Sequence, residues 1–138
     1  MPEALSDDEI GFLLEVLELA RAGSTEQLAE LLAAGVPVNL TNAAGDSLLI
    51  LAAYHAHEDT VRLLLDQGAD TARVNDRGQT ALGAAVFRQA TGIVELLLAA
   101  GADPRHGGPS AIEVARFFEL EEMLRLLEPA GGQAGPSA

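Results

Sequence analysis

The hydrophobic residues of this chain recur three and four positions apart in short runs, and this spacing predicts amphipathic helices. The apolar positions of two such runs are Val61, Leu64 and Leu65, then Ile93, Val94, Leu97 and Leu98. Gly68 and Gly101 follow these runs and fit the left-handed position that ends a helix. Ser47 and Thr80 precede two further apolar runs and are expected to cap the helices there. The pattern predicts two pairs of short helices.

The two helix pairs are copies of one another. A shift of 33 residues aligns Gly45 with Gly78, Ser47 with Thr80, Leu49 with Leu82, Ala52 with Ala85, Leu64 with Leu97 and Asp70 with Asp103. Between the pairs, residues 42–45 and 75–78 each begin with asparagine and end with glycine, which predicts tight hairpin turns. A period of this length, with two helices in each unit, predicts a stacked solenoid.

The repeat resembles the ankyrin repeat family, whose unit is a hairpin followed by two antiparallel helices. The resemblance covers residues 10–128 and implies an all-α ankyrin-repeat solenoid of stacked helix-turn-helix units with short β-hairpin-like loops. We expect four repeats, at about residues 10–41, 42–74, 75–106 and 107–128. The first and last are degraded, as expected of units that shield the stack from water. The Thr-Pro-Leu-His box of the family is altered to Ser47-Leu48-Leu49-Ile50 and Thr80-Ala81-Leu82-Gly83.

The two ends of the chain differ from the repeats. Residues 1–9 form an acidic segment that leads into the first helix, and Ser6 with Glu9 predicts a capping box there. Residues 129–138 are rich in glycine, alanine and proline and bury nothing, so a disordered tail is expected.

Composition excludes several function classes. The 138 residues suffice for one domain, and the absence of cysteine excludes disulfide scaffolds, thiol catalysis and the usual zinc sites. A net charge of −13, with arginine but no lysine, argues against nucleic-acid binding and favours a basic or amphipathic protein partner. No apolar run reaches the roughly 18–20 residues that span a membrane, and the N-terminus is too acidic for a secretory signal, so a cytoplasmic protein is expected. Arginine in place of lysine, with abundant alanine and glycine, suggests a high-GC bacterial source.

The family resemblance implies binding through the hairpin tips and the exposed end of each first helix. These positions are Arg21, Tyr54, His55, Phe87, Arg88, Phe117 and Phe118 on the helices, and Asp46, Asp76, Arg77 and Gln79 in the hairpins. Four of the five aromatic residues fall in this column. An exposed aromatic ring is favourable when a partner covers it, and tyrosine and arginine are enriched in binding hot spots. Two alternatives stay open: Phe117 or Phe118 caps the last repeat, and Tyr54 and Phe87 pack laterally between repeats.

Two enzyme-like patterns have simpler explanations. Gly45-Asp46-Ser47-Leu48 and Asp103-Pro104-Arg105-His106 imitate the nucleophile block and the Asp-x-x-His pair of Gly-Asp-Ser-Leu hydrolases. The repeat accounts for both, since Thr80 replaces Ser47 one unit later and Asp103 repeats Asp70. His55 and His57 lie near Glu58 and Asp59, but a spacing of two does not suit a helical metal site. No glycine-rich phosphate loop is present, so neither cofactor nor metal is expected.

The sequence therefore predicts a small, stand-alone, non-catalytic protein-binding module, monomeric by itself. It would bind a partner protein through its concave face and hairpin tips, and act stoichiometrically as an adaptor, inhibitor or accessory factor. We expect neither nucleic acid nor a membrane as partner. The alternatives are a self-associating structural protein, whose exposed aromatic column would pair with a second copy, and a serine hydrolase.

Overall fold

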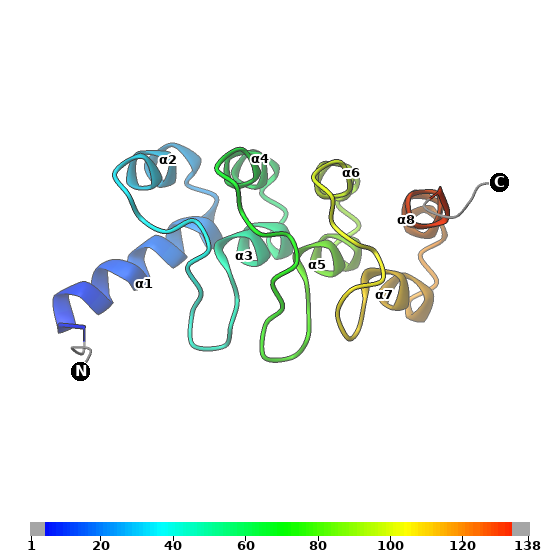
Figure 1. Ribbon diagram of the computed structural model, residues 1–138, viewed down its shortest axis with the longest axis horizontal. Helices are drawn as coiled ribbons and strands as arrows, with labels where there is room; N and C mark the ends of the chain where they lie inside the picture. The colour runs from blue at the N-terminus through cyan, green and yellow to red at the C-terminus, as the bar shows by residue number, and fades with distance from the viewer. Residues whose placement is uncertain (1–4, 134–138) are drawn as a thin grey trace.

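The computed structural model describes residues 5–133, with side chains described as far as Glu128. Its eight helices are α1 (Asp7–Ala22), α2 (Thr25–Ala33), α3 (Leu48–Tyr54), α4 (Glu58–Asp66), α5 (Ala81–Phe87), α6 (Thr91–Ala99), α7 (Ala111–Phe117) and α8 (Glu121–Gln133). In Figure 1 the first helices of the four pairs lie side by side in one row, and the second helices form a row above them. The loops that precede α3, α5 and α7 project below the rows. This arrangement confirms the predicted all-α solenoid.

The first helix of each pair begins at a side-chain cap. The Ser47 Oγ accepts a hydrogen bond from the backbone N–H of Ile50, and the Thr80 Oγ1 accepts one from Gly83, both at 3.0 Å. In α1 the Ser6 side chain and the Glu9 side chain cap each other's backbone N–H, which confirms the predicted capping box. Ser110 starts α7 in the same way. A hydroxyl at this position satisfies one of the backbone donors that a helix start leaves free.

The core runs between the two rows of helices. Leu49, Leu64, Leu82 and Leu97 are fully buried, and they come from the equivalent positions of the second and third repeats. In the first row, small residues are also fully buried, among them Ala52 in α3 and Ala85 in α5. Small side chains allow neighbouring helices to approach closely, so α3 and α5 bury every residue except the last aromatic one of each.

The hairpins before α3 and α5 are held by asparagine side chains. The Asn42 Oδ1 accepts hydrogen bonds from the backbone N–H groups of Ala44 and Asp46, and Asn75 repeats this pattern one unit later. These bonds confirm the predicted tight turns. Among the described residues the hairpins contain isolated bridges only, Thr41 with Ser47 and Gly107 with Ser110, so no regular sheet forms there.

The predicted C-terminal tail overlaps α8, which continues to Gln133. The bounds of α8 thus include residues 129–133 of the segment for which a disordered tail is expected. Residues 134–138 of that tail, and residues 1–4 of the acidic N-terminal segment, lie outside the described residues. Within residues 5–133 no helix combines the length and the apolar composition needed to cross a membrane.

Candidate functional site

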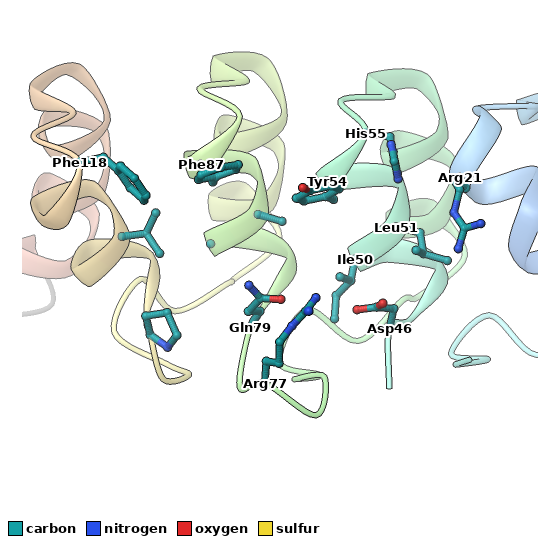
Figure 2. A pocket seen from close by; sticks show the side chains of 14 residues that line it. Arg21, Asp46, Ile50, Leu51, Tyr54, His55, Arg77, Gln79, Phe87 and Phe118 are labelled. Carbon is teal, nitrogen blue, oxygen red and sulfur yellow. The ribbon is translucent and has the colours of Figure 1, made fainter. Parts of the chain in front are cut away.

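An aromatic ladder runs along the row of first helices. We use this name for Tyr54, Phe87 and Phe118, which lie at the ends of α3, α5 and α7 (Figure 2). The Tyr54 and Phe87 rings are parallel with centroids 6.3 Å apart, and the Phe87 and Phe118 rings meet edge to face at 5.4 Å. All three side chains are about half exposed, at 44%, 45% and 48%. The rings therefore contact one another across the repeats while each keeps a face in solvent.

The backbone turns in the same way after each ladder residue. Ala56, Gln89 and Glu119 follow the aromatic positions and have positive φ angles of 60°, 54° and 56°. At each of these residues the chain turns sharply from a first helix into the next second helix. The same turn therefore ends the first helix in three successive repeats. Tyr54 and Phe87 are the last residues of α3 and α5, whereas Phe118 is the C-cap of α7, one position later than the repeat predicts.

A groove of about 580 Å³ lies beneath the ladder. Eight predicted site residues line it: Arg21, Asp46, Tyr54, His55, Arg77, Gln79, Phe87 and Phe118. Figure 2 shows the hairpin side chains of Arg77 and Gln79 on one side of the groove and the rings on the other. The structure thus brings together the helix-end and hairpin residues that the family resemblance links.

Three predicted site residues lie outside the groove lining. The Arg88 guanidinium lies 5.8 Å from the centroid of the Tyr54 ring and donates a 3.0 Å hydrogen bond to the Tyr54 carbonyl, so it borders the ladder. Phe117 is 79% exposed and touches the ladder only through Phe118, at 4.9 Å. The backbone N–H of Asp76 donates to the Ala44 carbonyl at 2.9 Å, which joins two hairpins.

The floor of the groove was not among the predicted site residues. It consists of Ile50, Leu51, Gly83, Ala84, Val114 and Pro109. Five of the six lie three or four residues before a ladder residue, which is one helical turn. Helical spacing counted back from each aromatic would have found them. Pro109 lies just before the α7 cap Ser110 and carries no such signal.

Polar contacts fix the hairpin side of the groove. The buried side-chain amide of Asn75 donates to the Asp46 Oδ1 and to the Gln79 Oε1, both at 2.8 Å. At the N-terminal end Arg21 pairs with Glu18 at 3.0 Å. The groove therefore presents ordered polar groups beside an apolar floor, a combination that suits a protein or peptide segment.

His55 lines the groove at the end that also holds Arg21 (Figure 2). Burial lowers the pKa of its ring, and the nearby charges of Arg21, His57 and Arg88 lower it further, against a smaller opposing effect of Glu18. The ring also meets the edge of Tyr54, with centroids 5.1 Å apart. The surroundings of the ladder therefore disfavour the charged form of His55 and hold its pKa below the ordinary histidine value.

Exposure and ring contacts show how the aromatic side chains of the two alternatives lie. Neither Phe117 nor Phe118 is folded into the last repeat as a cap, since both remain exposed. Tyr54 and Phe87 do pack laterally between repeats, and they are also half exposed. Lateral packing and availability for binding therefore coexist in the same rings.

Residues of the hydrolase-like and metal-like patterns make hydrogen bonds that stabilise the fold. Ser47 is 2% exposed and its Oγ caps α3, so the hydroxyl does not face solvent. The ring N–H of His106 donates to the Ala72 carbonyl, and that of His57 donates to the Arg21 carbonyl, each at 2.8 Å. Both histidines therefore join neighbouring repeats.

Comparison with known proteins agrees with this architecture. The family model described as ankyrin repeats (3 copies) matches residues 17–107. A putative ankyrin repeat protein of Pseudomonas aeruginosa is 54% identical over 52 residues, which are 38% of this chain and 30% of that protein. A putative ankyrin repeat-containing protein of Treponema pallidum is 42% identical over 91 residues, 64% of this chain and 30% of that protein. The neurogenic locus Notch protein of Drosophila melanogaster is 33% identical over 115 residues, 80% of this chain and 4% of that protein.

These matches span less than a third of the length of each relative. What they share with this chain is the repeat, and the family model covers more than half of the residues. The chain belongs to the ankyrin repeat family.

Proposed function

We propose that this chain is a non-catalytic protein-binding module whose partner lies in the groove beneath the aromatic ladder. Ankyrin repeats generally mediate protein–protein interaction, which supports this class of function. The observation that carries the proposal is the ladder itself, three half-exposed aromatic rings that contact one another across three repeats, beside one groove. Half-exposed rings next to a concave apolar floor gain free energy when a partner covers them.

The mechanism is stoichiometric association. The stacked helices hold the ladder rigidly, so binding orders few side chains and loses little conformational entropy. Tyr54 and Phe87 lie near the middle of the groove, where hot-spot residues usually lie, and surrounding polar groups would exclude water. Such a module would serve as an adaptor, an inhibitor or an accessory factor that stabilises another protein.

The test is affinity capture from a lysate of the source cells, followed by mass spectrometry. Wild-type protein is compared with Tyr54→Ala/Phe87→Ala and with the control Phe12→Ala. Phe12 lies on α1 and is 43% exposed, so the control removes a ring of matched exposure outside the groove. Circular dichroism of each variant checks that the helices are intact.

We expect a protein that wild type and Phe12→Ala capture and that the double variant loses. One aromatic hot spot at about 2 kcal/mol corresponds to a loss of about thirtyfold in affinity, and two that add in full to about a thousandfold, so the double variant should bind at least thirtyfold more weakly. Equal capture by all three proteins would show that the partner binds elsewhere and would overturn the proposed site.

A further inference from the structure

Charge in the groove differs from charge in the chain as a whole. The chain has 21 acidic residues against 8 basic ones, yet the groove lining holds Arg21 and Arg77 and only one carboxylate, that of Asp46. That carboxylate already accepts a hydrogen bond from Asn75. Arg88 adds a further positive charge at the rim, beside Tyr54. Although Glu18 neutralises Arg21 at one end, the groove still presents the guanidinium groups of Arg77 and Arg88 on an acidic protein.

The three arginines at the groove differ in how far they are neutralised, and Arg21 is the one that pairs with a carboxylate, that of Glu18 at 3.0 Å. Arg62, Arg73 and Arg116 pair with exposed carboxylates on other surfaces. Within the described residues, the ion pairs include neither Arg77 nor Arg88. Arg88 donates one hydrogen bond to the Tyr54 carbonyl, which fixes its guanidinium beside the ladder. Figure 2 shows the Arg77 side chain reaching from its hairpin toward the groove.

We propose that the groove binds an acidic, amphipathic segment of the partner protein, with carboxylates on Arg77 and Arg88 and apolar side chains against the ladder. This inference rests on the proposed function. A guanidinium offers a planar pair of donors that matches a carboxylate, and such charge-assisted bonds are the stronger ones. A basic segment would instead place its positive charges beside these two arginines. The carboxylate in the lining that could pair with it is that of Asp46, which already accepts a hydrogen bond from Asn75.

The negative charge of the whole chain does not oppose this assignment. At physiological ionic strength the screening length is about 8 Å, so distant acidic residues act weakly on a segment seated in the groove. Net charge governs encounter, whereas contacts inside the groove decide which side chains are held. The sequence predicts a basic or an amphipathic partner. Of these two, the charges in the groove favour an amphipathic partner with acidic side chains.

The test uses a random peptide library displayed on phage, selected on the full chain. We expect enriched sequences that combine Asp or Glu with aromatic or aliphatic residues. The tightest synthetic peptide is then measured by fluorescence anisotropy against Arg77→Glu and the control Arg125→Glu. Arg125 is exposed on α8 in the outer row, so the two variants make the same charge change on different surfaces. Binding should weaken by about tenfold or more with Arg77→Glu and less than about twofold with the control.

The outcomes separate the two proposals. Enriched peptides that carry Lys or Arg and lose binding to Tyr54→Ala/Phe87→Ala would overturn the acidic partner and leave the groove as the binding site. Acidic peptides that bind this double variant as well as wild type would overturn the groove itself. A selection without any peptide that depends on the two rings contradicts both proposals.

Discussion

Gly23 lies where the first repeat meets the second, and its missing side chain leaves room for the ring of His57. A Cβ atom there would lie 2.6 Å from the His57 Nδ1, and the backbone has a φ of +77°. The same ring donates from Nε2 to the Arg21 carbonyl. One glycine thus permits both the turn and the bond that joins two repeats.

Gly23→Ala should therefore cost more free energy of unfolding than Gly68→Ala. Both positions have similar positive φ, of +77° and +86°, but a Cβ at Gly68 would meet nothing within 4 Å. We expect about 1–2 kcal/mol from backbone strain at each site, and about 1–2 kcal/mol more at Gly23 from displacement of His57. Urea denaturation measures both variants, and equal losses would contradict the contact with His57.

His55 provides a prediction that depends on pH. Because its pKa is lower in the folded chain, the unfolded chain binds more protons as pH falls through the ordinary histidine range near about 6.5, so the folded state loses stability there. Arg88→Gln removes one of the charges that lower this pKa. NMR titration of the ring should give a higher pKa for His55 in the variant than in wild type. A pKa that stays the same or falls would show that Arg88 does not act on His55.

At the scale of elements, the first helices depend on their caps. Ser47 and Ser24 both stand at helix N-caps, but only Ser47 accepts a hydrogen bond from its helix, from the N–H of Ile50. The short α3 spans Leu48–Tyr54 and carries Tyr54 at its end, so its cap supports both the fold and the ladder. The outer helix α2 begins without this side-chain bond.

Ser47→Ala should lower the free energy of unfolding by about 1 kcal/mol or more, since it removes a buried cap. Ser24→Ala is the matched control and should change it by a few tenths of a kcal/mol. Chemical denaturation of the two variants makes the comparison. A similar loss in both would mean that the hydroxyl of Ser47 does not cap α3.

The sequence predicts elements better than it predicts which side chains meet. Caps and helical periodicity are local properties, so they can be read from the sequence. The 33-residue repeat predicts Ser47 and Thr80 as caps, and these caps mark the start of the helices that carry Tyr54 and Phe87. Whether Phe117 or its neighbour Phe118 lines the groove depends on the end of α7 and on its packing, so the sequence could not separate them. The bond from Arg88 to the Tyr54 carbonyl likewise depends on the register between two repeats.

On the scale of the whole molecule, hydrogen bonds join neighbouring repeats both at the outer helices and at the hairpins. Among the outer helices, the hydroxyls of Thr25 and Thr60 share a 2.7 Å hydrogen bond. Between the hairpins, the backbone N–H of Gly108 donates to the carbonyl of Gly78 at 3.0 Å, one repeat earlier. Stability and shape therefore come from contacts between neighbours, and the groove is a product of the stack rather than of any one repeat.

The exposed ladder raises the alternative of self-association. We expect the chain to stay monomeric, because a net charge of −13 repels a second copy. Light scattering on a size-exclusion column, at protein concentrations that differ a hundredfold and at two salt concentrations, should give a single monomer mass. A mass that rises with concentration in wild type and not in Tyr54→Ala/Phe87→Ala would instead show that the ladder pairs with a second copy.

Hydrogen–deuterium exchange with and without a captured partner tests the central claim most directly, because it maps the contact surface without any substitution. The account predicts that the partner slows exchange in residues 46–55, 77–88 and 109–118, which carry most of the groove. The outer helices α2, α4, α6 and α8 should exchange as in the free chain. Protection confined to those outer helices, or to the start of α1, would contradict the account and place the binding surface outside the groove.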